Sequence, residues 1–153
     1  MKKVMMVLAM LAVALVIGVG LCLVIDLSGC DYGGYFSMNV DGVSCQLNLS
    51  EVTAYEKDGV KYYRAIFADS GKSADVSFSM WEEDGQVRLH LDNPTLKING
   101  QKYLMPRPLK ERNYSLDDIM DHVFCVTFYD VPYSDDFRLN GRMYLQVSGG
   151  KLY

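Results

Sequence analysis

The stretch ADVSFSMWEEDGQVRLHL, residues 74–91, decides the fold class. Every second side chain is apolar in residues 75–80, and the same alternation returns in residues 87–91. This period of two is typical of β-strands with one buried face. Between the two runs lies Asp84-Gly85, a pair that readily adopts the positive φ angles of a tight hairpin turn. The stretch therefore predicts two antiparallel strands joined by a short turn.

The same pattern of short apolar runs separated by turn residues continues over the rest of the chain beyond the first 30 residues. Asx-Gly pairs recur at 41–42, 58–59, 84–85, 99–100 and 140–141. Short alternating or wholly apolar runs lie between them and predict an all-β, antiparallel sandwich or small barrel of about 8–10 strands. We expect strands near 34–40, 43–49, 51–57, 60–68, 74–82, 86–92, 95–98, 101–104, 123–130 and 137–148.

One segment predicts a helix. Ser115-Leu116-Asp117-Asp118 has the form of a capping box, with Asp in the place of the more usual Glu. Apolar residues follow at helical spacing. We therefore expect one short helix near 115–122.

The chain begins with Lys2 and Lys3, followed by an apolar run without charge from Val4 to Ile25. As a helix this run would span about 33 Å, enough to cross a bilayer. The lysines precede the run, so the positive-inside rule places residues 26–153 outside the cytoplasm. We expect an N-terminal hydrophobic helix that serves as a signal sequence or a membrane anchor.

Leu27-Ser28-Gly29-Cys30 resembles the lipobox of bacterial lipoproteins. The resemblance implies that a lipid such as palmitate is attached to the Cys30 thiol and that the leader is cut before it. The retained anchor, a single-pass transmembrane helix with its N-terminus in the cytoplasm, and plain secretion remain alternatives. The expected organisation is a leader over residues 1–29, a tether over 30–34 and one β-domain over 35–153, held at the cell membrane or the outer membrane.

A second resemblance lies within the domain. Three stretches resemble small Bacteroidota lipoproteins of unknown function, namely residues 35–42, 126–130 and 139–145. The resemblance implies an antiparallel β-domain on a lipid tether. It carries over no catalytic residues, because none is assigned to those families.

Two cysteines remain within the domain, Cys45 and Cys125. An even pair in an oxidising compartment predicts a disulfide. However, Cys45 is in phase with the core-facing residues of its strand and Cys125 is out of phase with those of its own. Two separate thiols are the alternative.

The sequence offers little catalytic chemistry. It has no G-x-S-x-G motif, and its only two histidines are expected to be exposed. We expect no enzyme and no cofactor, with an envelope hydrolase using paired carboxylates as an alternative. Asp130, Asp135 and Asp136 are the only Ca²⁺ candidates, and solvated loop carboxylates are the simpler interpretation.

Charge disfavours nucleic acid as a partner. Residues 30–153 hold 13 Lys and Arg against 18 Asp and Glu, whereas a phosphate-binding face needs a positive balance. One local basic stretch contains Lys102, Arg107, Lys110 and Arg112. It is expected to be a solvated loop, or to meet an anionic headgroup or an acidic partner.

Tyrosine is in surplus, with 11 residues in the chain. Tyrosines are enriched at interfaces, so we expect a binding surface for a protein or a glycan, although cross-strand aromatic pairs on an outer sheet face would explain them too. A lipocalin-like carrier of a small apolar ligand is the alternative function. The surface candidates are Tyr62, Tyr63, Tyr133 and Tyr144.

Overall fold

The computed structural model describes residues 24–27, 30–40, 42–148 and 151–152 of the chain. Within these residues it contains eleven strands and one short 3-10 helix, and no α-helix. The elements are β1 (Val24–Asp26), β2 (Asp31–Val40), β3 (Val43–Lys57), β4 (Val60–Asp69), β5 (Lys72–Glu83), β6 (Gln86–Leu91), β7 (Thr95–Ile98), β8 (Gln101–Tyr103), η1 (Glu111–Asn113), β9 (Tyr114–Met120), β10 (Val123–Pro132) and β11 (Arg138–Ser148).

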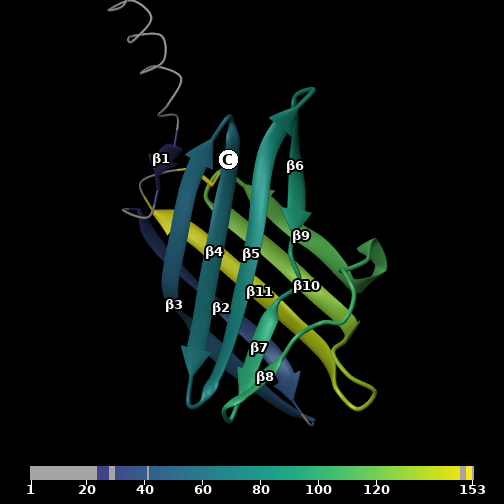
Figure 1. The fold of residues 1–153 in the computed structure, drawn as a ribbon. Coiled ribbons are helices and arrows are strands. Elements are labelled where there is room, and N and C mark those ends of the chain that lie inside the picture. Colours follow the sequence, from purple (N-terminus) through teal and green to yellow (C-terminus); the bar gives the residue numbers. More distant parts are fainter. Residues whose placement is uncertain (1–23, 28–29, 41, 149–150, 153) are drawn as a thin grey trace, which may run out of the picture.

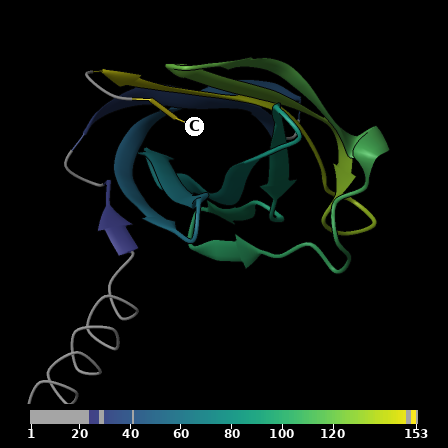
Figure 2. The ribbon, with the colours of Figure 1, turned by 90° about the horizontal axis from the view of Figure 1, so that it is seen from above.

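All eleven strands belong to one antiparallel sheet. Its main path is β8-β7-β5-β4-β3-β2-β11-β10-β9, while β6 pairs with β5 and β1 pairs with β3. The sheet curls over, so that β2, β11, β10 and β9 form one layer and the strands from β3 to β8 form the other (Figure 1, Figure 2). Its two end strands, β8 and β9, do not pair with each other. The all-β prediction is confirmed, and the arrangement is open and sandwich-like rather than a closed barrel.

Two-residue turns set the register between β3 and β4, between β5 and β6, and between β7 and β8. Asp58-Gly59, Asp84-Gly85 and Asn99-Gly100 all have positive φ, as predicted for tight hairpins. Asn140-Gly141 is different, because it lies inside β11, where Gly141 pairs with Met38 of β2. A Cβ on Gly141 would lie 2.5 Å from the carbonyl oxygen of Ser37. Gly141 therefore allows β11 and β2 to approach each other closely, and it does not form a turn.

The predicted helix near 115–122 is wrong, because these residues form strand β9 against β10. The Ser115 hydroxyl donates to the carboxylate of Asp117 at 2.7 Å instead of capping backbone N–H groups. An isolated helix of this length is marginal in water, whereas the edge of β10 offers a hydrogen-bonding partner for each alternate residue. The tertiary context overrides the local pattern here.

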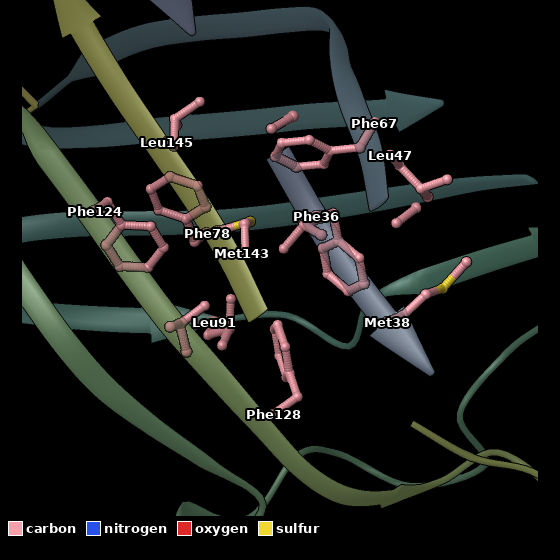
Figure 3. Close-up of a cluster of buried hydrophobic side chains, with 14 of the residues drawn as sticks. Phe36, Met38, Leu47, Phe67, Phe78, Leu91, Phe124, Phe128, Met143 and Leu145 are labelled. Carbon is pink, nitrogen blue, oxygen red and sulfur yellow. The ribbon is translucent and has the colours of Figure 1, made fainter. Parts of the chain in front are cut away.

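The core lies between the two layers and is rich in phenylalanine (Figure 3). Phe78 of β5 stacks on Phe124 of β10 with ring centroids 4.4 Å apart, which joins the layers at their centre. Phe36 of β2 packs against both Phe67 and Phe128, with ring centroids 5.9 and 5.8 Å apart. These buried rings pack together in the space between the two layers.

The N-terminal part departs from expectation at two points. The predicted hydrophobic helix lies mostly in residues 1–23, outside the described residues, but Val24 and Ile25 form strand β1 on the edge of β3. Residues 31–34, expected as a tether, are already part of β2 and pair with β11. In the part of the chain that is described, no helix is both long and apolar enough to traverse a bilayer.

Candidate functional site

The outer face of β3, β4, β5 and β6 carries two parallel rows of side chains. One row runs Tyr55–Tyr62–Ser79–His90, because each of these residues is the direct cross-strand partner of the next. The adjacent row runs Thr53–Arg64–Ser77 by the same pairing and ends at Asp92, whose backbone N–H donates to the carbonyl of Ser77 at 2.9 Å. Four strands that lie side by side in Figure 1 thus present seven side chains on one surface, and Asp92 follows directly after β6.

These two rows form a shallow groove of about 360 Å³, which we call the tyrosine groove. Tyr55 and Tyr62 stack with ring centroids 5.0 Å apart and an interplanar angle of 14°. At the other end of the groove the imidazole of His90 lies 3.2 Å from the carboxylate of Asp92. The small side chains of Ser77 and Ser79 lie between them, and this size difference creates the hollow. The full lining is Thr53, Tyr55, Tyr62, Tyr63, Arg64, Ser77, Phe78, Ser79, His90 and Asp92.

Arg64 is held in position beside the tyrosine pair. Its guanidinium donates to both carboxylate oxygens of Asp75, with Nε–Oδ1 at 3.0 Å and Nη2–Oδ2 at 2.5 Å. Hydrogen bonding to Asp75, and then the charge of that carboxylate, raises the pKa of Arg64. A bidentate pair restricts the guanidinium to one orientation. The groove therefore combines an aromatic platform with fixed polar groups.

A second stacked pair lies on the outer face of the other layer. Tyr35 and Tyr144 are cross-strand partners on β2 and β11, with ring centroids 5.5 Å apart. Nearby, the hydroxyls of Thr127 and then Ser115 donate to Asp117 and lower the pKa of its carboxyl group. This second stacked pair supplies a matched surface for comparison.

The four predicted surface tyrosines divide into two groups. Tyr62 and Tyr144 lie on outer faces, as the preceding paragraphs describe. Tyr63 and Tyr133 are buried, with 3% and 6% exposure, so their rings offer little surface to a ligand. Their hydroxyls donate to the backbone carbonyls of Leu152 and Pro94, each at 2.6 Å, and burial raises the pKa of both phenols. A tyrosine enters a core readily when a carbonyl accepts its hydrogen bond, which is why strand phase alone misplaced them.

The predicted Cys45–Cys125 disulfide is not formed. Both cysteines are free, on β3 and β10. Cys45 pairs with Met38 of β2, whereas Cys125 lies beside Arg142, whose Nε donates to its sulfur at 3.0 Å. In the sheet, β2 and β11 lie between β3 and β10, and this separation keeps the two thiols apart.

Cys30, the predicted lipidation residue, lies close to the edge of β3. It is partly buried against the core, and its backbone N–H donates to the carbonyl of Leu27 at 3.3 Å. Leu27 itself donates to the carbonyl of Ala54 at 2.7 Å. Ser28 and Gly29 lie outside the described residues.

The acidic candidates do not assemble into a metal centre. Asp130 makes an ion pair with Arg138 at 2.9 Å, and Asp135 and Asp136 are exposed in the loop between β10 and β11. Over the residues that the structure covers, no three His, Cys, Asp or Glu side chains gather closely enough to hold a metal ion. Among the described residues, Asp130, Asp135 and Asp136 therefore do not form such a group.

No protein-family model, curated protein or solved structure matches this chain. Function is accordingly inferred from the groove. Sequence reasoning identified Tyr62 but missed His90 and Asp92 as its neighbours. The signal was present in the two-residue turns at 58–59 and 84–85, which fix the register and so align these side chains.

Proposed function

We propose that the protein is a cell-envelope lipoprotein whose extracytoplasmic β-domain binds a glycan through the tyrosine groove. The observation that carries the proposal is the stacked Tyr55–Tyr62 pair facing His90 and Asp92 across a floor of serines. Tyrosine rings offer a flat apolar surface to the C–H face of a sugar, and the polar groups opposite offer hydrogen bonds to its hydroxyls.

The size and polarity of the groove favour a glycan over a protein partner. Its volume of about 360 Å³ lies within the range of small-ligand sites, roughly 300–1,000 Å³. Protein interfaces are usually broader, at roughly 800 Å² on each partner, and have an apolar centre. Here the centre of the groove is two serines and an ion-paired arginine.

The cellular location is part of the same proposal. The charged start, the apolar run and the lipobox-like residues 27–30 support attachment through Cys30, with the domain outside the cytoplasm. A retained single-pass anchor is the alternative location. In both cases the groove would face the envelope space, where glycans are abundant.

The two alternative functions receive less support. A lipocalin-like carrier needs an interior cavity, but stacked rings such as Phe78 and Phe124 occupy the centre of this domain. A hydrolase with paired carboxylates needs two acidic groups in one cleft. The tyrosine groove contains only one carboxylate, Asp92, which already faces His90.

The binding proposal is tested with a panel of neutral tetrasaccharides, namely cellotetraose, chitotetraose and maltotetraose, titrated into the ¹⁵N-labelled domain. We expect saturable chemical-shift changes at Ser77, Ser79 and His90 with at least one of them. The double variant Tyr55→Ala/Tyr62→Ala should abolish these changes. The matched variant Tyr35→Ala/Tyr144→Ala removes an equivalent stacked pair from the opposite face and should bind as the parent does. Equal binding by both variants, or no binding to any member of the panel, would refute the proposal.

The location is tested by intact-mass analysis of the membrane fraction. A diacylated or triacylated chain beginning at Cys30 is expected. A chain that begins at Met1 would contradict lipidation and support the anchor.

A further inference from the structure

A second cavity lies where the curled sheet fails to close. The segment of residues 104–113 crosses the open edge from β8 to β9, and a cavity of about 450 Å³ lies beneath it. Its walls include Arg107, Lys110 and Arg112 from this segment, Asn113, and Asp130 and Arg138 from β10 and β11. We call it the basic pocket.

The charge of the basic pocket is opposite to that of the chain. Four cationic side chains line it against one carboxylate, while the whole protein has a net charge of −4. The carboxylate, Asp130, is already engaged by Arg138 at 2.9 Å. Among the described residues, no ion pair joins Arg107, Lys110 or Arg112 to an acidic group. Three exposed cations that line one hollow and make no ion pair among the described residues favour binding of an anion.

The segment that carries these cations is fastened to the sheet. The Asn93 side chain accepts a hydrogen bond from the N–H of Leu109 at 2.8 Å and donates to the carbonyl of Arg107 at 2.9 Å. The Asn113 side chain donates to the carbonyl of Tyr129 at 3.3 Å. These hydrogen bonds fix the backbone of the segment that carries the cations, so that the segment loses less conformational freedom when a ligand binds.

The basic pocket and the tyrosine groove have a common neighbour. A third cavity, of about 540 Å³, shares His90 and Asp92 with the groove and Pro108 with the basic pocket. The three hollows therefore lie in series from the stacked tyrosines to the arginines, and together we call them the track. The η1 segment, which carries Arg112, lies on the opposite side of the domain from β1 (Figure 1, Figure 2).

We propose that this track binds a linear anionic glycan, with a carboxylate, sulfate or phosphate group in the basic pocket and neutral sugar faces in the tyrosine groove. The sugar part of this inference rests on the proposed function, whereas the anion site stands on its own geometry. A ligand that spans the track from the stacked tyrosines to the arginines has to be a linear chain, so we infer an envelope polymer rather than a single lipid headgroup.

The anion site is tested first with inorganic sulfate at low ionic strength, read from the Asn113 side-chain amide and the arginine Nε–H signals. We expect saturable shifts. The triple variant Arg107→Gln/Lys110→Gln/Arg112→Gln should bind at least about tenfold more weakly, because charge-assisted hydrogen bonds are lost. Lys57→Gln/Lys72→Gln/Lys97→Gln removes the same charge from residues outside the basic pocket and should bind within about twofold of the parent, since distant charges are screened. Equal weakening in both triple variants would overturn the anion site.

The complete track is tested with tetragalacturonate and its methyl ester, which share one sugar skeleton and differ in charge. The acid should bind at least about tenfold more tightly than the ester, a preference that the Arg107/Lys110/Arg112 variant removes. The Tyr55→Ala/Tyr62→Ala variant should weaken both ligands. Equal affinity for acid and ester overturns this inference even if the tyrosine groove binds sugars. Sulfate binding without any effect of the tyrosine substitutions contradicts the glycan function and retains the anion site.

Discussion

Gly34 is predicted to be required for the full stability of the pairing of β2 with β11. An alanine Cβ at this position would lie 2.2 Å from the carbonyl oxygen of Tyr144 and 3.1 Å from Cα of Leu145. The first distance is about 1 Å short of ordinary contact, and the obstructing atom is backbone, which cannot rotate away. Overpacking costs about 1–3 kcal/mol, and each lengthened ladder hydrogen bond costs about 1 kcal/mol more. Gly34→Ala should therefore lower the free energy of unfolding by about 2–4 kcal/mol, against a typical total of about 5–15 kcal/mol.

Gly33 provides the control at the neighbouring position. A Cβ there would meet only the flexible side chain of Gln146, at 3.5 Å. Gly33→Ala should change the unfolding free energy by less than about 1 kcal/mol, since alanine also restricts the unfolded chain. Urea unfolding followed by circular dichroism and by the fluorescence of Trp81 measures both variants. If Gly34→Ala proved as stable as Gly33→Ala, the close approach of β2 and β11 in this register would be refuted.

Three further predictions concern stability. Tyr133→Phe should cost about 1–2 kcal/mol in urea unfolding, because it leaves the buried Pro94 carbonyl without its donor, and an unchanged midpoint would contradict the burial of this hydroxyl. Burial, and then the nearby Cys30, raises the pKa of Tyr32 from 10.0 to about 12. Tyr32 therefore ionises at a lower pH in the unfolded chain than in the folded one, so the free energy of unfolding should be constant below pH 10 and fall as the pH rises toward 12. Circular dichroism and tyrosinate absorbance measure this fall, and a free energy of unfolding that increased over the same range would contradict the raised pKa. A chain beginning at Cys30 should fold but be less stable by about 1–3 kcal/mol than one beginning at Val24, because it lacks β1 and the Leu27–Ala54 hydrogen bond; equal urea midpoints would show that β1 contributes nothing.

The strands were predictable because their signals are local. Alternation in residues 75–80 and 87–91, together with the turn at Asp84-Gly85, defines β5 and β6 without reference to the rest of the chain. Even the predicted break between 43–49 and 51–57 has a counterpart, since β3 is continuous but carries an irregularity between Leu49 and Glu51. A local sequence pattern predicts those strands and turns that neighbouring residues determine.

The errors share a physical cause, which is that distant partners decided the outcome. Residues 114–120 became a strand because the edge of β10 was available, although their own pattern favours a helix. Tyr63 and Tyr133 entered the core because the carbonyls of Leu152 and Pro94, at distant positions in the sequence, accept their hydroxyls. No local pattern contains such information.

The candidate site was predictable only in part. The surplus of tyrosines pointed to Tyr62, and the basic stretch pointed to Arg107, Lys110 and Arg112. Their joining into one track depends on the curl of the sheet and on the path of residues 104–113 across its open edge. The contribution of Arg138 from β11 to the same pocket could be seen only in three dimensions.

The central claim is that the outer face of β3 to β6 binds sugar through its stacked tyrosines. The most direct measurement is the chemical-shift map of the ¹⁵N-labelled domain with the neutral tetrasaccharide panel. The account predicts saturable shifts that cluster at Ser77, Ser79 and His90 and vanish in Tyr55→Ala/Tyr62→Ala. Shifts that cluster around Tyr35 and Tyr144 instead, or that persist unchanged without Tyr55 and Tyr62, would contradict it.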